Sequence, residues 1–203
     1  MCIRDSLLAA PDAPWQLRLT SIKPWPCCRH THPTIDAGIE IARQVGNRSI
    51  ERVDVQTYQA ALDVCDRVSP QSEYEAKFSL QHTAAAAIRD GKVDFTSFDP
   101  AARQRLAGDA ARVSIAAAEP YRSRYPDAWG AKVTAYLGDG ATVTAEREHA
   151  FGDPENPLDD AAMRAKAKML LEFGGVADAD GFISAILALA DDGPLPALPA
   201  GDA

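Results

Sequence analysis

Two neighbouring segments in which apolar and polar residues alternate constrain the fold of this chain more than any other feature. They are Ala131–Leu137 and Ala141–Phe151, and the loop Gly138-Asp139-Gly140 separates them. Alternation with a period of two predicts strands with one buried face, and the glycine loop predicts that the two strands form an antiparallel hairpin. A sheet is therefore expected, although 38 of the 203 residues are alanine, the residue that most favours helices.

The rest of the chain changes repeatedly between strand patterns and helix patterns. Short alternating runs predict strands at Trp15–Ile22 and Ile50–Tyr58. Capping residues, prolines at helix starts and glycines at helix ends predict helices over residues 33–46, 72–89, 159–173 and 180–190, with one or two more within 101–118. This order predicts an α+β fold: a small mixed sheet with packed helices over residues 15–151, a helical segment over 152–203, and residues 1–14 outside both.

The charge balance excludes several classes of partner. The chain has 21 basic and 29 acidic residues and a net charge of −8 at pH 7. Nucleic acids and anionic membranes bind basic surfaces, so neither is an expected partner. No run of 18 apolar residues is present, and the first ten residues lack the apolar core of a signal peptide, so we expect a cytoplasmic protein.

The cysteines predict neither a metal site nor a disulfide framework. Cys2, Cys27, Cys28 and Cys65 show none of the spacings of a structural zinc site, and adjacent cysteines do not readily bridge each other. We interpret each of them as a small buried apolar residue in a reduced chain. No metal and no cofactor is expected.

Polar residues capable of chemistry gather between Lys23 and Asp36. Lys23, Arg29, His30 and His32 follow a predicted strand and lie where a helix is expected to begin at Pro33. Cations and free backbone N–H groups at a helix start favour binding of a carboxylate or a phosphate. The alternative interpretation is that Lys23 and Arg29 are solvated surface charges and that the histidines cap the helix.

A second polar group lies in the predicted helix 72–89. Lys77, Gln81 and His82 are about one helical turn apart and can present a cation, an amide and an imidazole together. The alternative is an ordinary amphipathic helix with a polar outer face. The sequence has no glycine-rich phosphate loop and no nucleophile motif.

These two stretches, in this order and spacing, resemble the MmgE/PrpD family, which includes 2-methylcitrate dehydratase, cis-aconitate decarboxylase and iminodisuccinate epimerase. The first motif is Lys23-Pro24-Trp25-Pro26-Cys27-Cys28-Arg29-His30-Thr31-His32-Pro33 with Ile35-Asp36-Ala37. The second runs from Ser69-Pro70 through Ala76-Lys77-Phe78-Ser79-Leu80-Gln81-His82 to Asp90-Gly91-Lys92-Val93. A weaker third match is Asn156-Pro157-Leu158, and the resemblance extends from about Leu17 to Leu198.

The resemblance implies a particular domain arrangement. Members of the family have a large helical domain, built from the N-terminal half and a C-terminal return, with a smaller α+β lid domain between the two parts. This chain resembles the lid and the C-terminal return. We therefore expect a fragment that lacks full activity on its own and that belongs to a homodimer in the full-length protein.

The resemblance also implies a reaction class, that of a lyase or an isomerase. The expected chemistry is cofactor-independent proton abstraction next to a carboxylate of a small di- or tricarboxylate, followed by dehydration, decarboxylation or epimerisation. Lys23, His32 and His82 are the expected catalytic residues, with Lys23 binding a carboxylate and the role of His82 open because many members have tyrosine there. Arg29, His30, Lys77 and Gln81 are the expected substrate-binding residues.

A competing hypothesis is a non-catalytic α+β module for dimerisation or ligand binding. The enzyme hypothesis predicts that Lys23, Arg29 and His32 converge at the helix start. The competing hypothesis predicts that these side chains are dispersed and that an apolar face is exposed instead.

Overall fold

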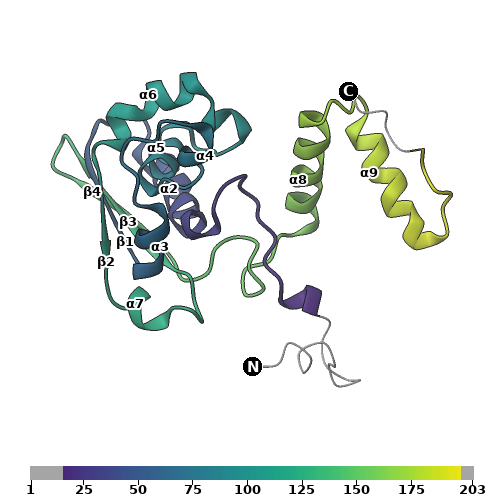
Figure 1. Cartoon of the computed structure of the whole chain (residues 1–203), viewed down its shortest axis with the longest axis horizontal. Helices are drawn as coiled ribbons and strands as arrows, with labels where there is room; N and C mark the ends of the chain where they lie inside the picture. The colour runs from purple at the N-terminus through teal and green to yellow at the C-terminus, as the bar shows by residue number, and fades with distance from the viewer. Residues whose placement is uncertain (1–15, 198–203) are drawn as a thin grey trace. The chain divides into compact units, whose positions relative to one another are not determined.

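The structure, a computed structural model, describes residues 16–197 and contains a four-stranded sheet (Figure 1). The strand order is β2-β1-β3-β4. Strands β1 (Ile50–Thr57) and β2 (Val113–Ala117) are parallel, whereas β3 (Ala131–Leu137) is antiparallel to both β1 and β4 (Thr142–Arg147). The predicted hairpin, the predicted strand after residue 50 and the α+β fold class are confirmed. The expected separate stretch 1–14 lies outside the described residues.

Helices make up most of the remaining structure. The α-helices of the sheet-containing part are α2 (His32–Val45), α3 (Gln59–Cys65), α4 (Glu73–Ala76), α5 (Leu80–Asp90), α6 (Pro100–Ala110) and α7 (Tyr121–Arg124). Short 3₁₀ helices are η1 (Gln16–Leu19), η2 (Arg29–Thr31) and η3 (Phe95–Phe98). After them come α8 (Asp160–Phe173), α9 (Ala179–Ala188) and η4 (Leu189–Asp191).

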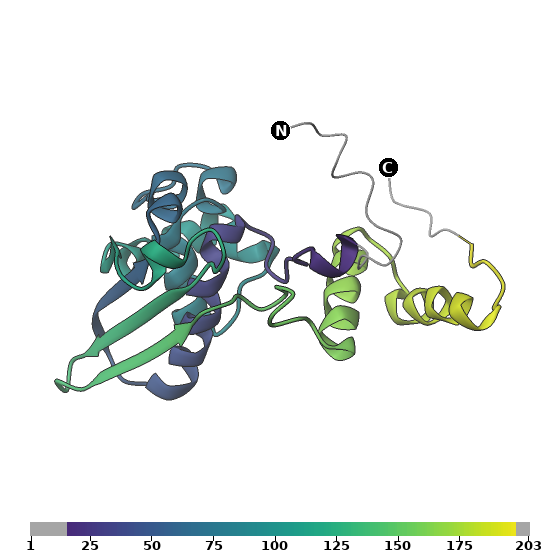
Figure 2. The same ribbon diagram turned by 90° about the horizontal axis from the view of Figure 1, so that it is seen from below.

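One face of the sheet is covered by α2 and α5. Alternate residues of β1, among them Val53 and Val55, are buried as expected and pair with Ala135 and Val133 of β3. Ile41 of α2 lies in the same apolar core. Figures 1 and 2 show these helices on one side of the strands. The opposite face presents polar and charged residues, so this is a two-layer structure with one solvated sheet face.

The contact between α2 and α5 depends on small residues. A Cβ atom added at Gly38 of α2 would lie 2.8 Å from the Cβ of Ala87. The alanine run 84–87 in α5 is fully or almost fully buried. The two helices therefore approach closely, and this contact holds the start of α2 in place.

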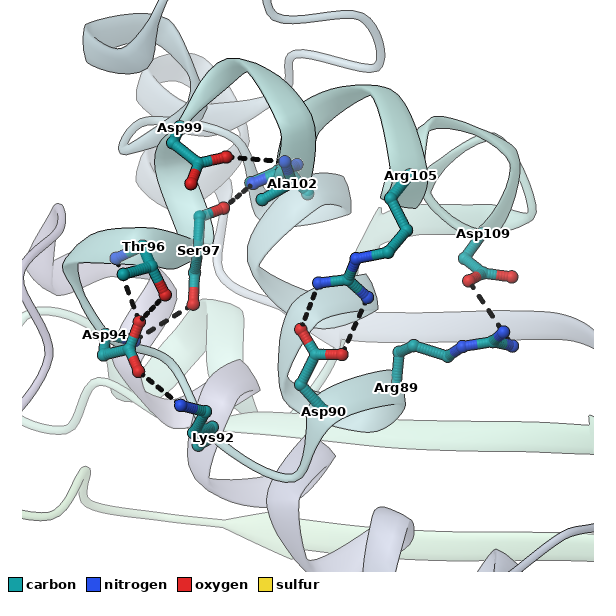
Figure 3. Close-up of polar contacts among 11 residues, drawn as sticks. Arg89, Asp90, Lys92, Asp94, Thr96, Ser97, Asp99, Ala102, Arg105 and Asp109 are labelled. Atoms are coloured by element: carbon teal, nitrogen blue, oxygen red, sulfur yellow. Dashed lines mark hydrogen bonds and ion pairs between the residues drawn. The ribbon is translucent and has the colours of Figure 1, made fainter.

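The connection from α5 to α6 is held by a group of ion pairs and caps (Figure 3). Arg105 donates two hydrogen bonds of 2.8 Å to the carboxylate of Asp90 at the end of α5. Gly91, with φ of +65°, ends α5 as the sequence predicts. The carboxylate of Asp99 caps α6 by accepting from the Ala102 N–H at 2.7 Å.

The expected strand Trp15–Ile22 is wrong over its described part. Gln16–Leu19 form the 3₁₀ helix η1, and Leu17 and Leu19 are 78% and 56% exposed; Trp15 lies outside the described residues. The Ile22 N–H donates to the Gly152 carbonyl at 2.8 Å, but no neighbouring strand pairs with the preceding residues described. Without such a partner, alternation alone does not produce a strand.

The expected continuous helix 72–89 is interrupted. Helix α4 ends at Ala76, and Ser79 caps a new helix by accepting the His82 N–H at 3.0 Å. The Ser79 hydroxyl also donates to the Arg67 carbonyl, which fixes the bend. Lys77 therefore precedes α5 and does not share a helical face with Gln81 and His82.

The expectation of one or two helices through residues 101–118 is only partly correct. Helix α6 ends at Ala110, and Val113–Ala117 form β2, with Val113 paired to Val53. The short run VSIAA has no periodicity that separates a buried strand from a helix. Only its pairing with β1 decides the outcome.

The chain divides into two compact units, with the boundary after Pro157. The first contains the sheet and the turn Gly152–Pro157. The second contains α8 and α9, which correspond to the predicted helices 159–173 and 180–190. No described residue of α8 is buried, and an apolar groove lies between α8 and α9, lined by residues such as Leu170 and Ile186. Among the residues that the structure covers, no helix has the length and apolar character needed to cross a bilayer.

Candidate functional site

The segment Lys23–Asp36 leads from a proline-containing loop into the first turns of α2. The Cys28 N–H donates to the Lys77 carbonyl at 2.9 Å, so the loop is fixed against the chain just before α5. Residues Arg29–Thr31 form η2, and Pro33 stands in the first turn of α2, where its missing N–H costs no hydrogen bond. This local structure sets the positions of Arg29, His30 and His32.

Arg29 is held by an acidic and an aromatic side chain from distant parts of the chain. Its Nη2 donates to Oδ1 of Asp153, whose side chain is 3% exposed. Its guanidinium carbon lies 4.2 Å from the ring centroid of Trp129, which is cation–π distance. Its other terminal nitrogen, Nη1, is buried and has no hydrogen-bond partner.

His30 lies in an aromatic cluster formed with Tyr58, Tyr125 and Trp129. The imidazole stacks on Trp129 with centroids 4.6 Å apart and an interplanar angle of 12°. Its Nδ1 is 2.9 Å from the hydroxyl of Tyr58, and Tyr58 stacks on Tyr125 at 4.5 Å. Burial lowers the pKa of His30, and the Arg29 charge lowers it further. The ring is therefore mainly neutral at pH 7.

His32 is almost fully buried, with 2% of its surface exposed, and its Nε2 has no partner. Burial lowers the pKa of His32 to about 3, and the charges of Lys23 and Arg29 contribute in the same direction. Arg29 precedes His32 by three residues, and His32 is the first residue of α2.

Lys23 is the exposed cation of the segment. Its Nζ donates to the Cys27 carbonyl at 3.3 Å, and its residue surface is open to solvent. Lys23, Arg29 and His32 therefore share the segment that leads into α2, and of these three residues Lys23 is the exposed one.

Asp36 connects the start of α2 to the turn after β4. Its two oxygens accept hydrogen bonds from the Trp25 indole at 2.8 Å and from the Phe151 N–H at 2.7 Å. Burial raises the pKa of Asp36 to about 6, although both hydrogen bonds oppose the increase. Asp36 thus titrates close to neutrality.

Unpartnered polar atoms are concentrated in this segment. Among the described residues, the buried side-chain nitrogen and oxygen atoms without a hydrogen-bond partner are Nη1 of Arg29, Nε2 of His32 and Oγ1 of Thr34. Each such atom costs about 1–3 kcal/mol, and native structures contain few of them. All three of these atoms lie within the six residues from Arg29 to Thr34. This short segment is therefore where the described chain leaves buried polar atoms without hydrogen bonds.

The other three predicted residues are not brought into this group. Lys77 pairs with Glu73 at 2.6 Å, four residues earlier. The amide of Gln81 accepts from the Arg67 N–H and donates to Asp66, so both of its ends are engaged. His82 is 1% exposed, and its Nε2 is 2.7 Å from the Ser97 carbonyl. A carbonyl only accepts, so Nε2 carries the proton and connects α5 to η3.

The partners from distant segments were not found from the sequence. Asp153 lies in the turn after β4, and Trp129 lies in the loop before β3. An acidic residue inside the predicted rigid turn Gly152–Pro157 is a signal that could have identified Asp153. No comparable signal exists for Trp129. Within residues 16–197, no group of three or more potential ligands gathers around a metal-sized space.

Comparison with known proteins adds one finding. A family model described as the MmgE/PrpD C-terminal domain matches residues 25–191, which include η2, α2, the whole sheet and both helices of the second unit. The match begins just after Lys23 and covers Arg29, His30 and His32. No curated protein matches the chain.

Proposed function

The chain belongs to the MmgE/PrpD family, and on this premise we propose that the segment Lys23–His32 binds the carboxylates of a small di- or tricarboxylate. The proposed reaction is cofactor-independent removal of a proton from the carbon next to a carboxylate. It ends in loss of water, loss of carbon dioxide or return of the proton. The family includes lyases such as dehydratases, and this chain carries its C-terminal domain.

The chemistry explains why cations are needed. When the proton leaves, the electron pair of the C–H bond spreads onto the adjacent carboxylate and increases its negative charge. A positive group placed where this charge develops stabilises the transition state, and one such contact is worth about 3 kcal/mol. Lys23 and Arg29 supply the positive charge, and the charges of both lower the pKa of His32.

The histidines supply neutral imidazoles. His30 and His32 both have lowered pKa values, so both imidazoles are mainly neutral at pH 7. A neutral imidazole can accept a proton at one nitrogen or donate one from the other. We assign His32 to hydrogen bonding with the substrate and His30 to holding the binding surface against Trp129. The proposal does not depend on His82, Lys77 or Gln81.

The observation that carries the proposal is the group of unpartnered polar atoms on Arg29, His32 and Thr34. A structural role would have provided partners for these atoms within the fold, as it does for Gln81 and His82. A ligand with several carboxylate oxygens supplies acceptors for the Arg29 and His32 nitrogens.

Calorimetric titration of the 203-residue chain tests the ligand class. The panel is citrate, cis-aconitate and succinate, with acetate and sulfate as controls for a single carboxylate and for a bare anion. We expect the multivalent carboxylates to bind at least about tenfold more tightly than acetate, a difference of about 1.4 kcal/mol. Binding should weaken with added salt. Equal affinity for all five anions would show non-specific ion pairing and would refute the proposal.

A second function is favoured by one observation on the second unit. Phe173, Ile186 and Leu187 are 69%, 40% and 46% exposed, although they are large and apolar. Such residues commonly mark a protein interface. The alternative is therefore a dimerisation module, and sedimentation velocity distinguishes it: a dimer that forms without carboxylate and binds none of the panel supports this alternative.

A further inference from the structure

Two cysteines pack in one cluster beside the candidate site, and neither has a role in the proposed function. Cys28 directly precedes Arg29, and Cys65 is the last residue of α3. Both pack in one apolar cluster with Tyr58 and Leu80. Cys65 has no exposed surface, whereas Cys28 is partly exposed. Cys28 is therefore the more accessible residue of the pair.

The two thiols influence each other's ionisation. The Cys65 thiol favours the Cys28 thiolate as a hydrogen-bond donor and lowers the pKa of Cys28 to about 6, and the same interaction raises the pKa of Cys65. The backbone N–H of His30 and the charge of Lys23 act on Cys28 in the same direction, and burial opposes them. Cys27, Tyr58 and Arg67 are further titratable groups that act on the pair. Cys27 and Tyr58 are in their neutral forms at pH 7, and the positive charge of Arg67 lowers the pKa of Cys65.

The adjacent cysteine provides a contrast within the same loop. Cys27 is 7% exposed, and its sulfur interacts with the Thr31 hydroxyl at 3.2 Å. Burial raises the pKa of Cys27 to about 12, so it remains a thiol at physiological pH. Two neighbouring residues thus have opposite character, and only Cys28 combines exposure with a second thiol as a partner.

We propose that Cys28 and Cys65 form a thiol oxidation site. A hydroperoxide oxidises Cys28, and Cys65 then reacts with the oxidised Cys28 to form an intramolecular disulfide. This inference rests on the two thiols and does not depend on the proposed carboxylate chemistry.

The reaction has two balanced steps. The Cys28 thiolate attacks one oxygen of hydrogen peroxide, the O–O bond breaks, Cys28 becomes a sulfenic acid, and hydroxide leaves. The Cys65 sulfur then attacks the Cys28 sulfur, the S–O bond breaks, and the Cys65 proton leaves with the hydroxyl group as water. The peroxide is reduced by two electrons, and the two thiols are oxidised to one disulfide. A small thiol reductant reverses the change.

The bridge would connect the start of η2 to the end of α3. The backbone of Cys28 is already fixed by its N–H bond to the Lys77 carbonyl at 2.9 Å and by the Thr31 N–H at 3.0 Å. Tyr58, whose hydroxyl is 2.9 Å from Nδ1 of His30, packs in the same cluster as both cysteines. Oxidation would therefore restrain the aromatic cluster that supports Arg29.

Peptide mapping after mild oxidation tests the inference. All proteins carry Cys2→Ser, so that the three described cysteines are the only thiols. The reduced chain is treated with a small excess of hydrogen peroxide, remaining thiols are blocked with N-ethylmaleimide, and trypsin releases Leu19–Arg29 and Val53–Arg67. We expect these two peptides to be joined, with one N-ethylmaleimide group on Cys27 and a mass about 2 Da below the sum of Val53–Arg67 and the singly blocked Leu19–Arg29, because two hydrogens are lost.

Variants assign the bridge to the correct pair, because Leu19–Arg29 contains both Cys27 and Cys28. The linked peptide should persist in Cys27→Ser and disappear in Cys28→Ser and in Cys65→Ser. Dithiothreitol should separate the peptides in each positive case. Persistence in Cys28→Ser, or sulfinic acid at Cys28 with Cys65 still free, would overturn the inference.

A pH profile tests the hydrogen bond without requiring a disulfide. The rate of iodoacetamide labelling at Cys28 should reach half its maximum near pH 6 in the Cys2→Ser protein. Cys65→Ala removes the donor and should move this midpoint upward by at least about one unit, whereas Cys65→Ser retains a donor and should restore much of the shift. An identical midpoint in all three proteins would show that Cys65 does not activate Cys28.

Discussion

Arg29 and Asp153 lie 124 positions apart in the sequence and form an ion pair whose carboxylate is almost fully buried. Asp36 makes a second connection to the same region through the Phe151 N–H. The start of α2 is therefore fixed by the turn that follows β4. The geometry of the candidate site depends on both ends of the first unit.

Loss of the Asp153 carboxylate should destabilise the protein strongly. Asp153→Ala leaves the Arg29 charge buried without its partner, and it also removes the acceptor of the Ala150 N–H. We expect the free energy of unfolding to fall by about 3 kcal/mol or more, measured by urea denaturation at pH 7. Glu155→Gln changes an exposed acid in the same turn and should cost less than about 0.5 kcal/mol. Similar losses in both variants would contradict a special role for the pair.

Asp36 should make the protein less stable as pH rises from about 4 to 6. The unfolded carboxyl ionises near 3.8, whereas the folded one keeps its proton until about 6. The folded state therefore binds more protons in this interval, and stability falls with pH by up to about 3 kcal/mol. Asp36→Asn removes this contribution. The difference in the free energy of unfolding between Asp36→Asn and wild type should therefore shift in favour of the variant as pH rises from 4 to 6, whichever protein is more stable at pH 4. Parallel curves of unfolding free energy against pH would contradict the prediction.

His32 should produce the opposite dependence. The unfolded imidazole takes up a proton near pH 6.5, but the folded one does so only near pH 3. Stability is therefore complete above pH 6.5 and decreases as pH falls toward 3. His32→Gln should flatten this acid-side loss, measured by urea unfolding between pH 4 and 7. Because Asp36 and His32 act in opposite directions, the curve of unfolding free energy against pH should be flatter for wild type than for Asp36→Asn. If His32→Gln lost as much stability as wild type between pH 7 and 4, this account would be contradicted.

Close packing between α2 and α5 predicts opposite effects for two glycine substitutions. In Gly38→Ala the new methyl group would lie 2.8 Å from the Cβ of Ala87, whereas Gly108 in α6 has no atom within 4 Å of the new position. We expect Gly38→Ala to destabilise by about 1–3 kcal/mol and Gly108→Ala to stabilise by up to about 1 kcal/mol. Thermal unfolding measures both. A stabilising Gly38→Ala would show that the helices separate without cost.

Elements with local signals could be predicted from the sequence. The hairpin was recognised because its glycine loop and alternation lie within a few residues, and Gly91 ended α5 because the helix end needs a positive φ. The strand β2 was missed because five residues of mixed pattern become a strand only through pairing with β1. The break before α5 was missed because Ser79 bonds to Arg67, twelve residues earlier.

The candidate site shows the same limit. The sequence identified Arg29, His30 and His32 because they are adjacent polar residues at a helix start. It could not show that Trp129 and Asp153 complete their surroundings, because tertiary folding alone brings those side chains to Arg29. It placed Lys77, Gln81 and His82 on one face because spacing within an assumed continuous helix was the only available evidence.

The affinity for cis-aconitate of wild type, Lys23→Gln and Lys92→Gln, measured by calorimetry at low salt, tests the account most directly. Lys23 is the exposed cation of the proposed site, whereas Lys92 pairs with Asp94 beside α5 and provides the same change of charge elsewhere. We predict that Lys23→Gln weakens binding about tenfold and that Lys92→Gln binds like wild type. Equal affinities in all three proteins, or no binding by wild type, would contradict the claim that this segment holds a carboxylate.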